Sequence, residues 1–357
     1  MTAQHTGWDA AGFRSDIETT LQEFVAAQAA WLEHLGPDAA RLVEHARTGV
    51  SGGKRFRAAF CWWGHQAVST GTDDAALLRA CAALELLHAS ALVHDDFMDA
   101  SDVRRGRPAT HRAFEQLHRE QGWAADAAQY GASAAILLGD LLLSWSDELL
   151  RTCGLPSDRV LDALGYFDLT RTEVVAGQFL DVSAQARGAA DVETAMTVLR
   201  YKSAKYSIER PLHIGAALGG AGPETITELT RFGLPLGEAF QLRDDLLGVF
   251  GDPAVTGKPA GDDLVEGKRT VLVALALDAL PEAEARVLDA GLGAQLGPAE
   301  VARLQHLVAE SGAREQVEMV ISELTERSLT ALARADITEP AREVLASLAA
   351  QATQRTV

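Results

Sequence analysis

The sequence predicts an all-α protein, and two observations support this prediction. Apolar residues recur mostly every three or four positions over long segments, which is the spacing of one helix face. Ala, Leu and Glu, which favour helices, dominate these segments, whereas alternating strand-like runs bounded by hairpin signals are absent. The expected helices span residues 12–35, 75–99, 129–150, 157–185, 191–218, 225–248 and 299–334.

Clusters of Gly and Pro separate these segments, and the least regular stretches are 100–128 and 249–270. There is no low-complexity linker and no repeat of solenoid period. A single helical domain over 1–357 is therefore the simplest organisation, with a motif-bearing core at about 50–270 and further helices over 271–357. Each irregular stretch follows an Asp-Asp motif, which places loops at the mouths of two acidic sites.

Composition narrows the class of protein. A net charge of −18 argues against nucleic acid as a partner, because phosphate backbones select basic surfaces. Three scattered cysteines give no disulfide framework, and residues 1–10 lack the features of a secretory signal. The most apolar stretch, 131–145, contains Asp140 and is shorter than the ~20 residues that span a bilayer. We therefore expect a buried helix there, no transmembrane segment and a cytoplasmic protein.

The first acidic motif, Asp95-Asp96-Phe97-Met98-Asp99, ends a strongly apolar helical segment. On a helix, positions i and i+4 project from one face, so Asp95 and Asp99 can hold the same hard cations. Mg²⁺ suits carboxylate oxygens and is commonly shared with substrate phosphates. Taken alone, this motif fits a solvated acidic helix end equally well.

A second acidic motif removes much of that ambiguity. Asp244-Asp245, preceded by Gln241, again ends an apolar helix. The charged residues that follow it are Lys258, Asp262, Asp263, Lys268 and Arg269. Two acidic helix ends, each followed by basic residues, predict a site for a diphosphate bridged by Mg²⁺.

The basic residues gather in short glycine-containing segments, which is how local anion sites are built in an acidic chain. Lys54 and Arg57 lie three positions apart after Gly52-Gly53, and Arg104-Arg105-Gly106 follows the first acidic motif. His88 precedes Asp95 by two helical turns and can reach the same cavity. No nucleophile motif or Gly-rich nucleotide loop is present. The chemistry predicted is electrophilic, through metal-assisted departure of diphosphate.

These motifs closely resemble those of the trans-isoprenyl diphosphate synthases, the polyprenyl synthetase family, and most closely the bacterial geranylgeranyl diphosphate synthases. The resemblance rests on GGKRFR (52–57), LELLHASALVHDDFMDASDVRRGRPATH (84–111), GQFLD (177–181), YKSAKYS (201–207), FQLRDDLLGVFGD (240–252) and GKPAGDDLVEGKRT (257–270). It implies one large helical bundle around a central substrate cavity. It also implies a homodimer.

The resemblance implies a role for each motif residue. Isopentenyl diphosphate, the nucleophilic substrate, would be held by Lys54, Arg57, His88 and Arg105. The allylic diphosphate would be held by Arg104, Lys202, Ser203, Gln241, Lys258 and Lys268. Three Mg²⁺ ions would bind with it through Asp95, Asp99 and Asp244, supported by Asp96, Asp245 and Gln178. The residues most important for catalysis would be Asp95, Asp99, Arg104, Lys202, Asp244 and Lys258.

Enzymes of this family ionise the allylic diphosphate, let the isopentenyl double bond attack the cation, and lose a proton to the departing pyrophosphate. The sequence departs from the family pattern at two positions. The second motif usually ends in a third Asp, which is Gly248 here, and a common Thr is Ser203. The first change is expected to remove only an outer carboxylate, and the second keeps the hydroxyl.

Product length in this family depends on residues that precede the first acidic motif, because one helical turn, about 5.4 Å, is close to the length of an isoprene unit. Ser90 and Ala91 are small and leave room for the growing tail, while Leu87 and Leu84 stand higher and can close the tunnel. A C20 product is therefore expected, with C15 and C25 as alternatives. Neighbouring helices, around Ile136 and Phe179, are expected to line the same tunnel.

Two other functions fit part of the pattern. A class I terpene cyclase shares the helical fold and the acidic helix, but it needs no isopentenyl site, so Lys54, Arg57 and His88 argue against it. A non-catalytic regulatory subunit would be expected to lose acidic or basic motif residues. The first motif is complete here, and the second lacks only its last Asp.

Overall fold

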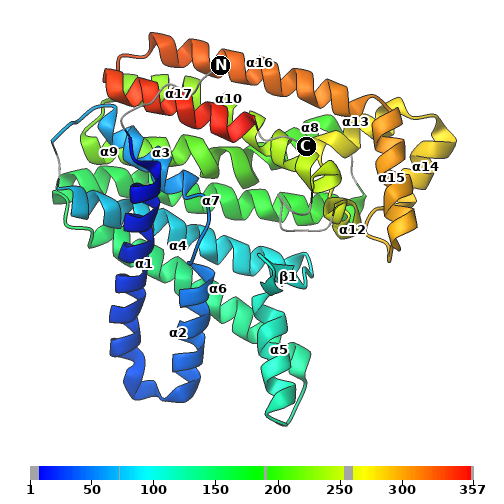
Figure 1. The fold of residues 1–357 in the computed structure, drawn as a ribbon, viewed down its shortest axis with the longest axis horizontal. Helices are drawn as coiled ribbons and strands as arrows, with labels where there is room; N and C mark the ends of the chain where they lie inside the picture. The colour runs from blue at the N-terminus through cyan, green and yellow to red at the C-terminus, as the bar shows by residue number, and fades with distance from the viewer. Residues whose placement is uncertain (1–7, 72, 189–190, 253–259, 355–357) are drawn as a thin grey trace.

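The computed structural model describes residues 8–71, 73–188, 191–252 and 260–354. The fold is all-α, as predicted, and Figure 1 shows long helices stacked roughly side by side, with α1 and α2 crossing them steeply. The helices are α1 (Ala10–Leu32), η1 (Glu33–Leu35), α2 (Pro37–Gly49), α3 (Phe56–Gln66), α4 (Asp74–Met98), α5 (Thr110–Glu120), α6 (Ala127–Arg151), α7 (Ser157–Arg187), α8 (Val192–Val198), η2 (Leu199–Glu209), α9 (Arg210–Gly219), α10 (Pro223–Phe250), α12 (Asp262–Glu266), α13 (Val271–Ala279), α14 (Glu282–Gly291), α15 (Pro298–Glu310), α16 (Ala313–Arg334) and α17 (Glu339–Thr353).

The helices are more numerous than the sequence analysis predicted. Helices α2, α3, α5 and α12 lie where none was expected, and α5 occupies part of the stretch 100–128 that was expected to be irregular. The predicted helix 299–334 is two helices, because Gly312 adopts a left-handed backbone (φ +76°) between α15 and α16. In the described part of the chain the only strands are β1 (Val103–Arg104) and β2 (Arg107–Pro108), an antiparallel pair.

Two clusters of buried apolar residues hold the helices together. One is formed mainly by α1, α3, α4, α6, α9 and α10, and the other by α10, α13, α15 and α16. Helix α10 contributes Phe232 and Leu236 to the first cluster and Leu242 and Leu246 to the second. Because α10 carries the second acidic motif, this motif is fixed between two packed cores.

Helix α6 corrects one expectation. This helix is 25 residues long, but only 33% of its most apolar stretch of 18 residues is buried. The helix is therefore not fully buried. One face packs against α4, while Ile136 and Leu137 point outward with 45% and 60% of their surface exposed. By length and composition α4 and α6 are both apolar enough to cross a membrane, and 72% of the α4 window is buried inside the protein.

The segment Leu199–Glu209 forms a π-helix between α8 and α9, a wider turn that often marks functional sites. Two glycines allow neighbouring helices to approach its backbone closely. A Cβ atom on Gly177 of α7 would lie 2.3 Å from the backbone nitrogen of Lys202. One on Gly237 of α10 would lie 2.4 Å from the backbone oxygen of Ala204. Any larger residue would separate these helices, so the two glycines fix the position of Lys202 relative to α7 and α10.

Candidate functional site

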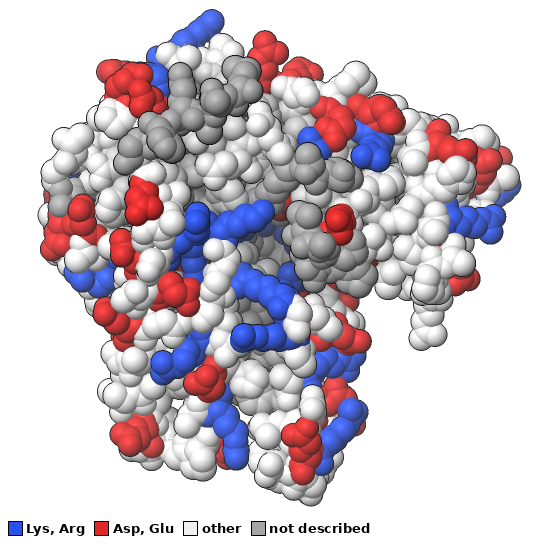
Figure 2. Space-filling view, in the orientation of Figure 1, with Lys and Arg blue, Asp and Glu red and all other residues white. Residues whose placement is uncertain are grey.

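Two adjoining cavities open between α4, η2 and α10, with volumes of 480 and 350 Å³. We call the first the acidic cavity, since six Asp residues line it, and the second the basic cavity, since five Arg or Lys residues of segments 52–57 and 103–108 line it. Figure 2 shows Lys and Arg side chains gathered around a hollow in this face of the molecule. The residues that line both cavities are Lys54, Leu92, Arg104, Ser203, Gln241 and Asp244. The cavities therefore share a wall.

The first acidic motif lies at the C-terminal end of α4, where its three carboxylates have different surroundings. Asp95 lines the acidic cavity and accepts a hydrogen bond from Gln178 Nε2 at 3.0 Å. Asp96 is buried and accepts one from Arg104 Nε at 2.8 Å. Asp99 caps the helix, and its Oδ2 atom is buried without a hydrogen-bond partner among the described residues. Burial, followed by the charge of Asp95, raises the pKa of Asp99 to about 6.

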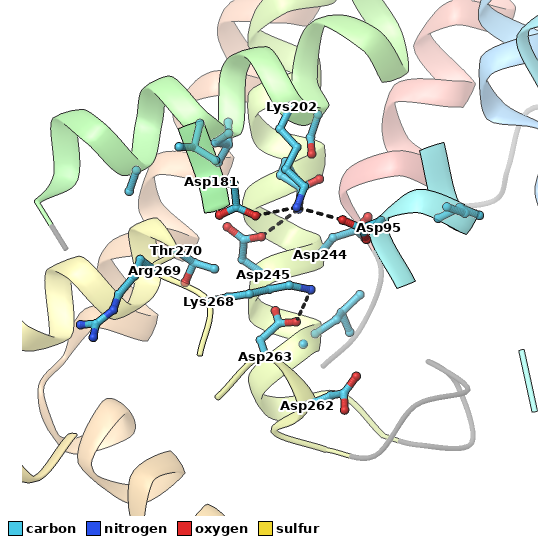
Figure 3. Close-up of a pocket in the computed structure, with 18 of the residues that line it drawn as sticks. Asp95, Asp181, Lys202, Asp244, Asp245, Asp262, Asp263, Lys268, Arg269 and Thr270 are labelled. Carbon is cyan, nitrogen blue, oxygen red and sulfur yellow. Dashed lines mark hydrogen bonds and ion pairs between the residues drawn. The ribbon is translucent and has the colours of Figure 1, made fainter. Parts of the chain in front are cut away.

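Lys202 projects from the π-helix into the acidic cavity and bridges two helices (Figure 3). Its Nζ atom lies 3.2 Å from Asp95 Oδ1 on α4 and 2.6 Å from Asp181 Oδ2 on α7. Burial lowers the pKa of Lys202, but the two carboxylates outweigh burial and raise it. The ammonium is therefore charged at neutral pH and holds the first acidic motif toward α7.

Lys268 occupies the opposite side of the acidic cavity, where Figure 3 shows it pointing toward Asp263. Its Nζ atom lies 3.4 Å from Asp263 Oδ1, 3.6 Å from Asp99 Oδ2 and 2.5 Å from Glu266 Oε2. Glu266 also accepts a hydrogen bond from Ser101 Oγ at 2.6 Å. These contacts join the segment after the first acidic motif to the segment after the second, although the two are far apart in the sequence.

The second acidic motif presents Asp244 to both cavities and Asp245 to the acidic cavity alone. Asp245 is 6% exposed and accepts a hydrogen bond from Gln241 Nε2 at 2.8 Å. Burial, followed by the charge of Asp263, raises the pKa of Asp245 to about 8. In the ligand-free protein at neutral pH, Asp245 is therefore largely protonated.

This raised pKa predicts how Asp245 affects stability. Between its unfolded pKa of 3.8 and its folded pKa of about 8, the folded protein binds more protons at Asp245 than the unfolded chain does. The contribution of Asp245 to the free energy of unfolding therefore decreases as the pH rises between these two values. We expect Asp245→Asn to become progressively more stable than the wild type from pH 4 to pH 8, as measured by urea unfolding. Asp278→Asn, at an exposed position of α13, is the control and should give a constant difference.

Three residues that line the basic cavity, Arg57, His88 and Ser207, form one connected group with Tyr206 behind them. Arg57 Nη2 donates to Ser207 Oγ at 2.7 Å, and its guanidinium lies 4.1 Å from the centre of the Tyr206 ring. His88 Nδ1 and Tyr206 Oη are hydrogen-bonded at 2.5 Å. Burial, followed by Arg57, lowers the pKa of His88 well below its usual value, so the ring is neutral. Arg57 and His88, which lie 31 positions apart, are thus placed side by side.

Arg55, between the predicted anion-binding residues Lys54 and Arg57, has a different role. Its guanidinium is 5% exposed and pairs with Glu18 at 2.5 Å and with Glu85 at 3.1 Å. Glu18 also accepts a hydrogen bond from the Gly52 nitrogen, and Glu85 accepts one from the Ala58 nitrogen. Arg55 is therefore a structural residue that anchors the loop before α3 to α1 and α4.

Arg104 and Arg105 lie on the hairpin formed by β1 and β2, where positive φ angles at Arg105 and Gly106 produce the tight turn. Arg104 lines both cavities and holds Asp96, whereas Arg105 lines only the basic cavity. Arg105 Nη1 donates to the Ser51 oxygen at 2.7 Å, beside Gly53. The hairpin thus closes the basic cavity against the glycine loop.

The residues predicted to control product length lie outside both cavities. Ser90 and Leu87 are each 3% exposed and Ala91 is half-buried, and the described linings of the two cavities do not include them. Ile136 and Phe179 point to the surface of the chain, with 45% and 70% exposure, so the expectation that they line a tunnel within it is wrong. Lys258 lies outside the described residues.

Several residues of the site could not be identified from the motifs alone. Asp181 ends the GQFLD segment, but only the fold shows that it pairs with Lys202. Tyr206 and Ser207 end the YKSAKYS segment, and a 3.6-residue helix period would not have placed them beside Arg57. Glu18 lies far from every motif and carries no signal in the sequence.

The fold and the cavities define the class: an all-α protein with adjoining acidic and basic cavities between its central helices. Comparison with known proteins gives the family. The model of the polyprenyl synthetase family matches residues 40–310. A crystal structure of geranylgeranyl pyrophosphate synthase from Corynebacterium glutamicum, complexed with isoprenyl diphosphate and magnesium, is 41% identical and has a TM-score of 0.95, covering 98% of this chain and 100% of that one.

Two curated relatives show the range of activities among similar proteins. The geranylfarnesyl diphosphate synthase of Natronomonas pharaonis is 36% identical over 61% of this chain and 59% of its own length. The geranylgeranyl diphosphate synthase of Methanosarcina mazei is 36% identical over 62% of this chain and 63% of its own length. The matched segments thus span about three fifths of these two relatives. The chain belongs to the polyprenyl synthetase family and is a prenyltransferase, so the resemblance inferred from its motifs is confirmed.

Proposed function

We propose that this enzyme condenses isopentenyl diphosphate with allylic diphosphates head to tail, in a Mg²⁺-dependent reaction that gives a C20 product. The observation that carries the proposal is the shared wall between an acidic and a basic cavity. Two diphosphates need separate sets of cationic side chains, yet their reacting carbons must meet. A terpene cyclase, which takes one diphosphate, has no need of the basic cavity.

Asp95, Asp99 and Asp244 are proposed to hold three Mg²⁺ ions together with the allylic diphosphate. The donors fit, since they are carboxylate oxygens and one of them, Asp99 Oδ2, is buried without a described hydrogen-bond partner. No three acidic, His or Cys residues among those described converge into a complete metal cage. This agrees with Mg²⁺ that is shared with substrate phosphates. Bound Mg²⁺ would neutralise the charge that develops on the departing diphosphate.

The basic side chains divide between the substrates. Lys54, Arg57, His88 and Arg105, around the basic cavity, are proposed to bind isopentenyl diphosphate. Arg104, Lys202, Ser203, Gln241 and Lys268, around the acidic cavity, are proposed to bind the allylic diphosphate, together with Lys258. Because Lys202 and Lys268 already bridge carboxylates there, a bound diphosphate would exchange these pairs for contacts to its own oxygens.

The decisive experiment is a product assay. The protein is incubated with isopentenyl diphosphate, Mg²⁺ and a C5, C10 or C15 allylic primer, and the products are dephosphorylated and sized by chromatography. The C20 alcohol is expected. If the main product were the C15 or the C25 alcohol, the proposed C20 chain length would be wrong. Hydrocarbon formed from geranylgeranyl diphosphate alone would indicate a cyclase, and activity only with a second protein would indicate a regulatory subunit.

Product length is proposed to depend on Ala91, one helical turn before Asp95 on α4. Ala91→Phe is expected to shift the main product from C20 to C15, because a ring there would meet the tail about one isoprene unit from the site. Ala75→Phe, at an exposed position of the same helix, should keep the C20 product. An unchanged product from Ala91→Phe would show that the tail takes another path. Ser90 and Leu87 are more buried, so substitution there also tests folding.

We further propose a homodimer formed through an apolar stripe on α7. Val175, Phe179 and Val182 recur at helical spacing and are 64%, 70% and 38% exposed, beside the outward face of α6. A second copy could bury this stripe. Light scattering is expected to give twice the 38.0 kDa of one chain, and Phe179→Glu should halve that mass. Met319→Glu, an equally exposed position on α16, is the control. A wild-type monomer would contradict the proposal.

The chain is proposed to form one domain and to work in the cytoplasm. Helix α10 belongs to both buried clusters, which supports one cooperative unit over the whole chain. The most apolar stretch of α4 is 72% buried inside the protein. This supports the proposal that α4 is a core helix and not a membrane span.

A further inference from the structure

Gly248 lies on the inner face of α10, one turn after Asp244 and Asp245, and lines the acidic cavity with them. The space where its side chain would be is filled by another residue. A Cβ atom on Gly248 would lie 1.9 Å from Asp263 Oδ2 and 2.4 Å from Asp263 Cγ. Real Cβ atoms essentially never make such short contacts. Any side chain at position 248 is therefore incompatible with the present position of the Asp263 carboxylate.

The segment that carries Asp263 is fastened to Gly248 itself. The Gly261 nitrogen donates to the Gly248 oxygen at 3.1 Å, and Gly261 takes a left-handed backbone (φ +82°) to begin α12. After α12, the backbone nitrogen of Lys268 donates to the backbone oxygen of Asp263 at 2.9 Å. Lys268 Nζ lies 3.4 Å from Asp263 Oδ1. The Asp263 carboxylate is thus held between the backbone of α10 and the Lys268 ammonium, facing the same cavity as Asp245.

We propose that Gly248 is a positioning residue: its missing side chain makes room for the Asp263 carboxylate, which completes the second acidic motif from a different segment of the chain. Position 248 and Asp263 are then alternative sources of one carboxylate. An Asp introduced at position 248 would not add a ligand group, because it would displace Asp263. This inference rests on the proposed function, in which the acidic cavity binds Mg²⁺ with a diphosphate.

Rotation of the Asp263 side chain can relieve the clash in a variant, since the atoms that a new Cβ would meet belong to its carboxylate. Folding should therefore be preserved while the carboxylate leaves the cavity. This separates a positioning role from a purely structural one, because a structural glycine would lower stability, whereas Gly248→Ala should mainly weaken cation binding.

The test is calorimetric titration of Mg²⁺ into the protein in the presence of inorganic pyrophosphate, together with urea unfolding of each variant. Gly248→Ala and Asp263→Asn are each expected to raise the Kd for Mg²⁺ about tenfold or more, as for residues that orient metal ligands. The double variant should be no weaker than Asp263→Asn alone, because both changes remove the same carboxylate. Gly248→Asp combined with Asp263→Gly should bind Mg²⁺ more tightly than Asp263→Asn, because position 248 then supplies the carboxylate.

Gly165→Ala is the matched control, because Gly165 is also within a helix, α7, and a Cβ there meets nothing within 4 Å. It should bind Mg²⁺ like the wild type. A Gly248→Ala variant with wild-type affinity, or losses that add in the double variant, would overturn the inference while leaving the proposed function intact. If Gly248→Ala fails to fold, the positioning role is overturned in favour of a structural one. A wild-type protein that binds no Mg²⁺ with pyrophosphate would overturn the proposed function, and the inference with it.

Discussion

Asp95→Asn is expected to lower kcat by about 10³-fold, the upper range for loss of one preorganised electrostatic contact. Asp95 lines the acidic cavity and lies 3.2 Å from the Lys202 ammonium and 3.0 Å from Gln178 Nε2. Asn preserves the shape and one acceptor oxygen but removes the charge proposed to bind Mg²⁺. The loss should appear in kcat, because that charge matters most as negative charge develops on the departing diphosphate.

Steady-state kinetics with C15 primer and isopentenyl diphosphate provide the measurement. The KM for isopentenyl diphosphate should change little, since Asp95 does not belong to the described lining of the basic cavity. Asp102→Asn is the matched control: it lies seven positions further on, its side chain is 70% exposed, and it pairs with Arg112. Its activity should stay close to that of the wild type. A loss smaller than tenfold in folded Asp95→Asn protein would remove Asp95 from the proposed metal site.

Glu85→Ala is expected to destabilise the protein by about 3–5 kcal/mol, which is typical when one partner of a buried ion pair is removed. Glu85 is 5% exposed and Arg55 is equally buried, so loss of the carboxylate leaves the guanidinium with Glu18 alone. The Ala58 nitrogen also loses its acceptor at the start of α3. Because these contacts hold the loop that carries Lys54, the KM for isopentenyl diphosphate should rise as well.

Urea unfolding with and without the substitution measures this effect. Glu85→Gln should fall between Glu85→Ala and the wild type, because its amide oxygen can still accept from the Ala58 nitrogen while the charge is lost. Glu44→Ala is the control, since Glu44 is 69% exposed and pairs with Arg47 only at the surface, where such pairs contribute ~0–1 kcal/mol. If Glu85→Ala and Glu44→Ala lowered the free energy of unfolding equally, another group would be neutralising Arg55 in place of Glu85.

The sequence by itself determined the fold class, the family and the composition of the site. Helical periodicity is a local property, so the long helices that carry the acidic motifs were predicted within a few residues of their ends. Short helices such as α3 and α5 were missed, because two or three turns give little periodic signal and their stability comes from packing. Asp95, Asp244, Lys202 and Lys54, which the motifs predict to bind metal or substrate, line the cavities.

Only the tertiary structure decided which charges around the cavities are neutralised by partners from distant segments. Arg55 lies between two residues of the expected anion site, yet it is paired with Glu18, which is 37 positions away. Gly248 reads as a lost carboxylate in sequence, whereas in space Asp263 fills the gap. Side-chain charge is read from one position, but its partners come from any segment that packs nearby. For this reason the sequence predicted what the site contains, and the packing of α1, α4, α10 and α12 decided how it is arranged.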